Sequence, residues 1–102
     1  MFKKIVFLIM AALLMNGARA QFVLSGQVTD ASSGKTLSGA HVVLSGHKFA
    51  AVTDESGRYS IRRIPAGKYV LRVSFMGYET WQEEISVNGN LKKDVTLRPS
   101  VL

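Results

Sequence analysis

The stretch of sequence that decides the fold is residues 54–75, DESGRYSIRRIPAGKYVLRVSF. It opens with a turn, because an acidic residue at the start can bond backbone amides two residues on and the glycine that follows accepts a positive φ. Residues 58–62 then alternate between polar and apolar side chains, as a half-buried strand does. After the Pro-Ala-Gly break at 65–67, residues 69–75 alternate again and form the strongest strand pattern in the chain. The stretch therefore predicts two strands set between tight turns.

Similar short segments lie on both sides of this stretch, and no 3.6-residue period is sustained. Residues 88–90, Asn-Gly-Asn, are a hairpin signal because Asn-Gly readily supplies the positive φ values of a type I′ turn. We therefore predict an all-β fold, a seven-stranded antiparallel two-sheet sandwich with a Greek-key, Ig-like topology. The expected strands are Phe22–Thr29, His41–Leu44, Lys48–Thr53, Arg58–Arg62, Tyr69–Phe75, Thr80–Val87 and Leu91–Leu97.

The first twenty residues differ in character from the rest. Two lysines, Lys3 and Lys4, precede eleven apolar residues, and Ala18-Arg19-Ala20 has the small-x-small pattern of a signal-peptidase site. Eleven residues are too few for a membrane-spanning helix, which needs roughly 20. We expect residues 1–20 to be a cleaved signal peptide, 21–98 the sandwich and 99–102 a C-terminal tail.

The charge of the chain is modest once this segment is removed. The 102 residues carry 13 Lys and Arg against 7 Asp and Glu, a net charge of +6. Lys3, Lys4 and Arg19 would leave with the signal peptide, so the mature chain has a net charge of +3. Its basic residues are spread over several strands and turns, which argues against a nucleic-acid partner. The absence of cysteine excludes a disulfide framework and a lipidated N-terminal cysteine.

The chain contains histidines and acidic residues, which can bind metals or catalyse reactions, but they are not spaced as in known metal or catalytic sites. His41 and His47 have no third His or Cys with which to hold a metal. The Asp54–Gly57 turn lacks the alternating oxygen ligands of a calcium loop. Glu83 and Glu84 are neighbours on a predicted strand, so they point to opposite faces and cannot act as an acid–base pair. We predict no catalytic, cofactor-binding or metal-binding residues, and hence no enzyme.

Four motifs follow one another at defined spacings. They are Gly26-x-Val28-x-Asp30; Gly34-Lys35-x-Leu37-x-Gly39-Ala40-x-Val42-x-Leu44; Thr53-Asp54-x-x-Gly57-x-Tyr59-x-Ile61; and Pro65-Ala66-Gly67-x-Tyr69-x-Leu71-x-Val73-Ser74-x-x-Gly77-Tyr78. In this order they resemble the carboxypeptidase regulatory-like domain, from about Ser25 to Leu97. The resemblance implies a seven-stranded, transthyretin-like sandwich.

These motifs also have physical roles that belong to a scaffold. Gly34 and Gly57 are expected to take a positive φ in turns. Gly39 and Ala40 are expected to let two backbones approach closely. Tyr78, directly after Gly77, is expected to pack over one end of the sandwich.

The position of the domain behind a signal peptide is similar to the N-terminal extension of TonB-dependent outer-membrane receptors of the Bacteroidetes type. In those receptors a plug and a large β-barrel follow, whereas this chain stops at residues 98–102. The resemblance implies a non-catalytic accessory or interaction domain of a nutrient receptor, on the periplasmic side and truncated before plug and barrel. It implies a TonB-system protein or the plug and barrel as partners, and outer-membrane association only through the missing barrel.

The alternative is a free-standing periplasmic or secreted module that binds carbohydrate. Related sandwiches include starch-binding modules, and Trp81 with Tyr78 and Phe49 could form a platform on which sugar rings stack. These three residues are the predicted ligand or partner contacts. Hydroxyisourate hydrolases share the transthyretin-like fold, but their Tyr-Arg-Gly-Ser tail is replaced here by Pro-Ser-Val-Leu.

Overall fold

The computed structural model describes residues 20–45 and 48–100, and these residues form strands and turns. The predicted signal peptide, apart from Ala20, lies outside the described residues, as do His47 and the last two residues of the tail. In the described part there is no helix long and apolar enough to cross a membrane. The strands are β1 (Gln21–Asp30), β2 (His41–Leu44), β3 (Phe49–Val52), β4 (Arg58–Pro65), β5 (Gly67–Ser74), β6 (Trp81–Val87), β7 (Leu91–Lys92) and β8 (Val95–Leu97).

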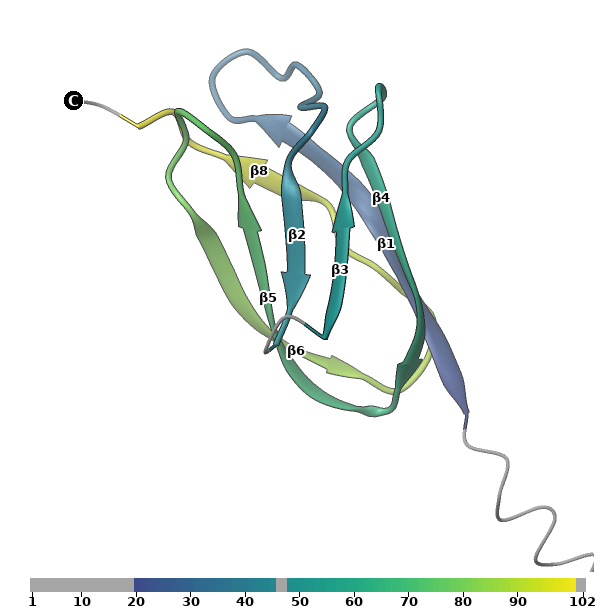
Figure 1. Ribbon diagram of the computed structural model, residues 1–102. Coiled ribbons are helices and arrows are strands. Elements are labelled where there is room, and N and C mark those ends of the chain that lie inside the picture. The colour runs from purple at the N-terminus through teal and green to yellow at the C-terminus, as the bar shows by residue number, and fades with distance from the viewer. Residues whose placement is uncertain (1–19, 46–47, 101–102) are drawn as a thin grey trace, which may run out of the picture.

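The strands form two sheets that face each other (Figure 1). In sheet I, β1 lies in the middle, with β4 on one side and β7 followed by β8 on the other. Sheet II has the order β3-β2-β5-β6 and is antiparallel throughout. We call the end of the sandwich that carries loops 31–40, 53–57 and 75–78 the upper end. The lower end is where β1 begins and where β4 connects to β5 and β6 to β7 (Figure 1).

The predicted all-β, two-sheet sandwich is confirmed, with two differences in detail. There are eight strands, because the segment predicted as Leu91–Leu97 is interrupted at Lys93 and Asp94. Both of its halves pair with β1 in parallel, so the sandwich is not antiparallel throughout. The parallel pairing follows from the path of the chain, which crosses from sheet II to sheet I after β6 and runs alongside β1.

The hairpin predicted at residues 88–90 is wrong for the same reason. β6 and β7 belong to different sheets, and Gly89 has no positive φ. The Asn90 side chain instead accepts a hydrogen bond from the backbone N–H of Val23 on β1, at 3.0 Å. A contact with a distant strand therefore overrides the local turn preference.

The core lies between the sheets and follows the predicted alternation. Buried apolar residues come from every strand except β3 and β7, and from the loop before β2. Each fully buried Leu, Val or Ile contributes roughly 1.5–3 kcal/mol, and together they largely offset the chain entropy. The buried apolar residues are Leu24, Val28, Leu37, Ala40, Val42, Leu44, Tyr59, Ile61, Ile64, Leu71, Val73, Ile85, Val87, Val95 and Leu97.

The glycines that permit this packing are only partly the expected ones. Gly34 and Gly57 have positive φ as predicted, 75° and 73°. Gly39 was expected to allow a close backbone approach, but a Cβ there would meet only the Phe75 ring, at 3.8 Å; its requirement is a positive φ of 87°. The close approach is at Gly26, where a Cβ would lie 1.8 Å from the carbonyl oxygen of Lys93.

Candidate functional site

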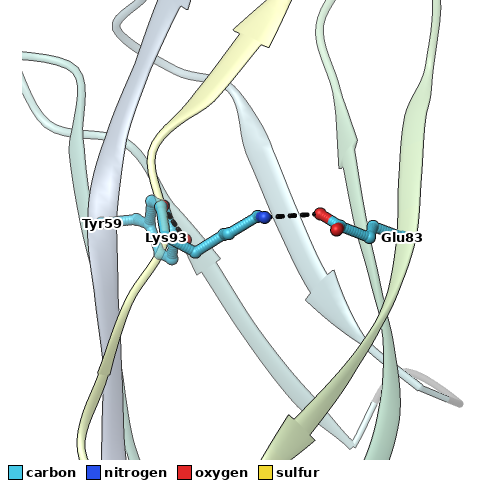
Figure 2. A network of polar contacts seen from close by, with 3 residues as sticks. All are labelled: Tyr59, Glu83 and Lys93. Carbon is cyan, nitrogen blue, oxygen red and sulfur yellow. Dashed lines mark hydrogen bonds and ion pairs between the residues drawn. The ribbon is translucent and has the colours of Figure 1, made fainter.

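One long side of the sandwich is a seam, where β6 of sheet II faces the interrupted strand of sheet I. Lys93 occupies the interruption and connects both sheets (Figure 2). Its backbone N–H donates to the Ser25 carbonyl at 2.7 Å, and its Nζ lies 2.7 Å from a carboxylate oxygen of Glu83 on β6. Both side chains are substantially exposed, so the pair adds about 1 kcal/mol at most. Lys93 is therefore a positioning residue for the seam.

Tyr59 explains why the strand breaks at Lys93. The Tyr59 ring lies beside Gly26, and its hydroxyl donates to the Lys93 carbonyl at 2.6 Å (Figure 2). Burial raises the pKa of Tyr59, with a smaller contribution from the negative charge of Asp94, so the hydroxyl stays protonated and remains a donor. Beyond the break, the Asp94 carboxylate accepts from the N–H of Gln27 at 2.9 Å. At the break between β7 and β8, side-chain hydrogen bonds thus take the place of the backbone hydrogen bonds of a continuous strand.

A surface hollow of about 450 Å³ lies beside Trp81 at the upper part of this seam. Trp81 packs partly against the core, and the Lys93 ammonium lies 5.8 Å from the centre of its ring. The other side chains of the hollow supply hydroxyl, carboxylate and guanidinium groups. An aromatic ring with such groups around it can stack on an apolar ligand face and bond polar groups at its edge. The hollow is lined by Ala31, Glu79, Thr80, Trp81, Thr96 and Arg98.

Tyr78 lies next to this hollow, at the upper end, but is engaged in the fold. Its ring packs edge-on against Phe75 with ring centres 5.5 Å apart, and its hydroxyl donates to the Asp30 carboxylate at 2.5 Å. The expectation that Tyr78 packs over the end of the sandwich is confirmed. The hydrogen bond from Tyr78 lowers the pKa of Asp30, and the same bond raises the pKa of Tyr78.

Phe49 lies away from the other two predicted contact residues. It begins β3, at the edge of sheet II opposite β6, and its ring packs edge-on against Tyr69 with ring centres 6.2 Å apart. Three strand spacings separate the two edges, about 14 Å. The structure therefore brings Tyr78 and Trp81 to one region and leaves Phe49 outside it. Their role as ligand contacts stays a prediction.

The remaining chemistry-bearing residues do not converge in the described part of the chain. Residues 20–45 and 48–100 contain no group of three His, Cys, Asp or Glu side chains that could hold a metal ion. His41 is exposed at the start of β2. Glu83 is paired with Lys93, and Glu84 lies on the other face of β6. Sequence reasoning missed Arg98 and Lys93, because only the folded chain places them beside Trp81.

The comparisons with known proteins agree with this architecture. The model of the CarboxypepD_reg-like domain family matches residues 24–101. TonB-dependent receptor P39 of Formosa agariphila is 33% identical over 94 residues, which are 92% of this chain and 9% of the receptor. The chain thus spans less than a tenth of that relative's length.

Two solved structures support the fold alone. A chain of a type II cohesin–X–dockerin complex from Acetivibrio cellulolyticus superposes with a TM-score of 0.67 at 21% identity, over 74% of this chain and 56% of that one. The 5-hydroxyisourate hydrolase of Klebsiella pneumoniae superposes with a TM-score of 0.62 at 23% identity, over 78% of this chain and 92% of the hydrolase. On the evidence of the matched family model and of its 33% identical relative, the chain belongs to the CarboxypepD_reg-like domain family.

Proposed function

We propose that this chain is a non-catalytic accessory domain of a TonB-dependent outer-membrane nutrient receptor, exported and held on the periplasmic side, in front of plug and barrel. The observation that carries the proposal is the relative: 92% of this chain aligns at 33% identity with 9% of a TonB-dependent receptor. A segment of that proportion suits a small module attached to a much larger transport protein, since this sandwich is too small to form a transport channel.

The geometry is compatible with an interaction role. Tyr78 and Tyr59 use their hydroxyls to fasten one segment to another. The chain after β8 is also fastened, because the Glu79 N–H donates to the Arg98 carbonyl and the Ser100 N–H donates to the Gly77 carbonyl, each at 2.8 Å. The chain therefore leaves at the upper end, opposite the start of β1 (Figure 1). A following plug would be held at a defined position relative to the sandwich.

The test is to read the gene beyond codon 102. We expect the reading frame to continue into a segment that encodes a plug and a barrel. A stop codon directly after Leu102 would contradict the receptor assignment and would leave a free-standing module.

The hollow beside Trp81 favours a second candidate function, the binding of a glycan. Stacking on Trp81, combined with hydrogen bonds that Arg98 donates and Glu79 accepts, is a chemistry suited to a sugar ring and its hydroxyls. In the proposed receptor this would assist nutrient capture. In a free module it would be the main activity.

Isothermal titration of the purified chain with a panel of oligosaccharides tests this candidate. Because Trp81 also packs against the core, Arg98→Gln is the cleaner variant, with Arg72→Gln on the outer face of sheet II as its control. We expect binding heat that Arg98→Gln and Trp81→Ala abolish and Arg72→Gln preserves. The absence of heat with every sugar would remove this candidate without affecting the receptor assignment.

A further inference from the structure

The lower end of the sandwich is basic and aromatic, and we infer that it binds an anionic lipid surface. Its four exposed cations, Lys48, Arg62, Arg63 and Lys68, are called the basic end. The inference deepens the proposed function, because it rests on an exported domain that lies close to a membrane. It adds a contact made by the sandwich itself, independent of any barrel.

A bulge in β4 places two of these cations side by side. Phe22 pairs with Ile64 and Leu24 with Ile61, so Arg62 and Arg63 together face one residue of β1. Ile61 and Ile64 stay buried on either side, and both arginines are exposed. Arg63 has a φ of 60°, a left-handed conformation that a non-glycine residue seldom adopts. The bulge thus adds one more outward-facing arginine to the lower end without exposing the core.

The other two cations come from sheet II. Lys68 is the second residue of β5 and is paired with Ser86 on β6, and Lys48 directly precedes β3. Lys68 thus lies beside the β4–β5 connection at the lower end, and Lys48 lies at the same end, where β3 begins (Figure 1). The positive charge therefore extends across the end from one sheet to the other.

No carboxylate neutralises this charge in the part of the chain that the structure describes. There the only ion pair is Lys93 with Glu83 on the seam, so the four cations of the basic end have no carboxylate oxygen within 4.0 Å. The nearest carboxylate along the strands belongs to Glu84, which pairs with Val70, two positions further up β5 than Lys68. The other acidic residues of the described chain lie in or beside the upper-end loops or on the seam: Asp30, Asp54, Glu55, Glu79, Glu83 and Asp94.

Aromatic side chains lie at the same end. Phe22, Phe49 and Tyr69 are partly buried against the lower core, and the Tyr69 hydroxyl donates to the Pro65 carbonyl at 2.7 Å. Rings that are apolar on one side and reach water on the other are typical of membrane interfaces. Clusters of four or more Lys and Arg near a membrane recognise anionic lipid headgroups. Cations and partly exposed rings together favour a lipid surface over an acidic protein, which would need no aromatic edge.

Vesicle sedimentation with the chain purified after export tests this inference. The probes are vesicles of phosphatidylcholine alone and vesicles of phosphatidylcholine mixed with phosphatidylglycerol. The test variant carries Arg62→Gln, Arg63→Asn and Lys68→Gln, where Asn is chosen because it tolerates a positive φ. The control variant carries Arg58→Gln, Lys92→Gln and Arg98→Gln, which remove the same charge from positions outside the basic end.

We expect the chain to bind only the phosphatidylglycerol vesicles, and more weakly as salt is added. Each basic residue near an anionic surface contributes about fivefold to the affinity, so the test variant should bind about a hundredfold more weakly while the control stays close to wild type. Failure to bind the anionic vesicles, or equal losses in both variants, would overturn the inference. Because the assay uses only this chain and lipid, such a failure would leave the receptor assignment to its own genetic test.

Discussion

The upper and lower ends of the sandwich are built in different ways. At the upper end, the turns have glycines at positive φ and are held by short hydrogen bonds, which the Asp30 and Asp54 carboxylates accept and the Thr53 hydroxyl donates. At the lower end, the turns are fastened by fewer side-chain bonds, and the exposed charge is entirely basic. Most of the family's motif residues lie at the upper end or in the core. This difference indicates that the motif residues specify the scaffold. The exposed surface proposed to bind a partner lies at the lower end, where fewer residues belong to the motif.

The largest expected contrast between the ends concerns two glycines. A Cβ at Gly57 would lie 2.9 Å from both the Thr36 Cβ and the Val28 carbonyl oxygen, at a φ of 73°. Gly57→Ala should therefore lower the free energy of unfolding by about 3 kcal/mol. At the lower end nothing lies within 4 Å of a Cβ at Gly89, so Gly89→Ala should change the free energy of unfolding by less than about 0.5 kcal/mol. Urea unfolding measures both, and similar losses would show that the ends do not differ.

The next contrast concerns two hydroxyls. The Thr53 hydroxyl is buried, donates to the Leu37 carbonyl at 2.6 Å and accepts from the Ala40 N–H at 2.8 Å. Thr53→Val keeps the shape of the side chain but leaves the Leu37 carbonyl and the Ala40 N–H unpaired. It should therefore lower the free energy of unfolding by about 2–3 kcal/mol. Ser45→Ala at the lower end removes an exposed bond from the Val70 N–H and should cost about 0.5 kcal/mol, since water can replace it. Equal costs in thermal unfolding would contradict this account.

A smaller effect should appear in the acid dependence of stability. The bond from Tyr78 lowers the pKa of Asp30 in the folded state, so its contribution is present above the pKa of the unfolded chain, about 4. That contribution is lost as the pH falls through the lower, folded-state pKa. As the pH falls below 5, the midpoint of thermal unfolding should therefore fall less in Tyr78→Phe than in the wild type. Tyr69→Phe, whose hydroxyl bonds a neutral carbonyl, is the control and should follow the wild-type curve. Parallel curves for wild type and Tyr78→Phe would refute the role of Asp30.

The smallest expected effect on stability is at the basic end. Arg62, Arg63 and Lys68 are exposed and form no ion pair in the described residues, so the triple variant used for vesicle binding should unfold within about 0.5 kcal/mol of wild type. Differential scanning calorimetry checks this. A large loss would mean that these residues support the fold, and the proposed separation between scaffold and free surface would fail at this point.

The sequence predicts the individual strands well, because alternation is a local property. His41–Leu44 was predicted with its observed bounds, and the strand at Tyr69 begins two residues earlier than predicted. Non-local features were not accessible. In residues 91–97 a polar residue, Lys93, stands where strict alternation would place an apolar one. This local irregularity does not identify the cause of the break at Lys93, which is the contact with Tyr59 and Gly26 on other strands.

The candidate sites depend on the same non-local information. The hollow beside Trp81 needs Thr96 and Arg98 from the far end of the chain, and the basic end gathers cations from β4, β5 and the turn before β3. Trp81 and Tyr78 were recognised because aromatic residues are conspicuous in a sequence. Their separation from Phe49 required the strand order of sheet II.

The measurement that tests the central claim most directly is an immunoblot of outer-membrane and periplasmic fractions, made with an antibody raised against the sandwich. The receptor assignment predicts a band in the outer-membrane fraction whose chain is about ten times as long as the domain, in line with the 9% share of the related receptor. A band of the size of the sandwich alone, free in the periplasmic fraction, would contradict it.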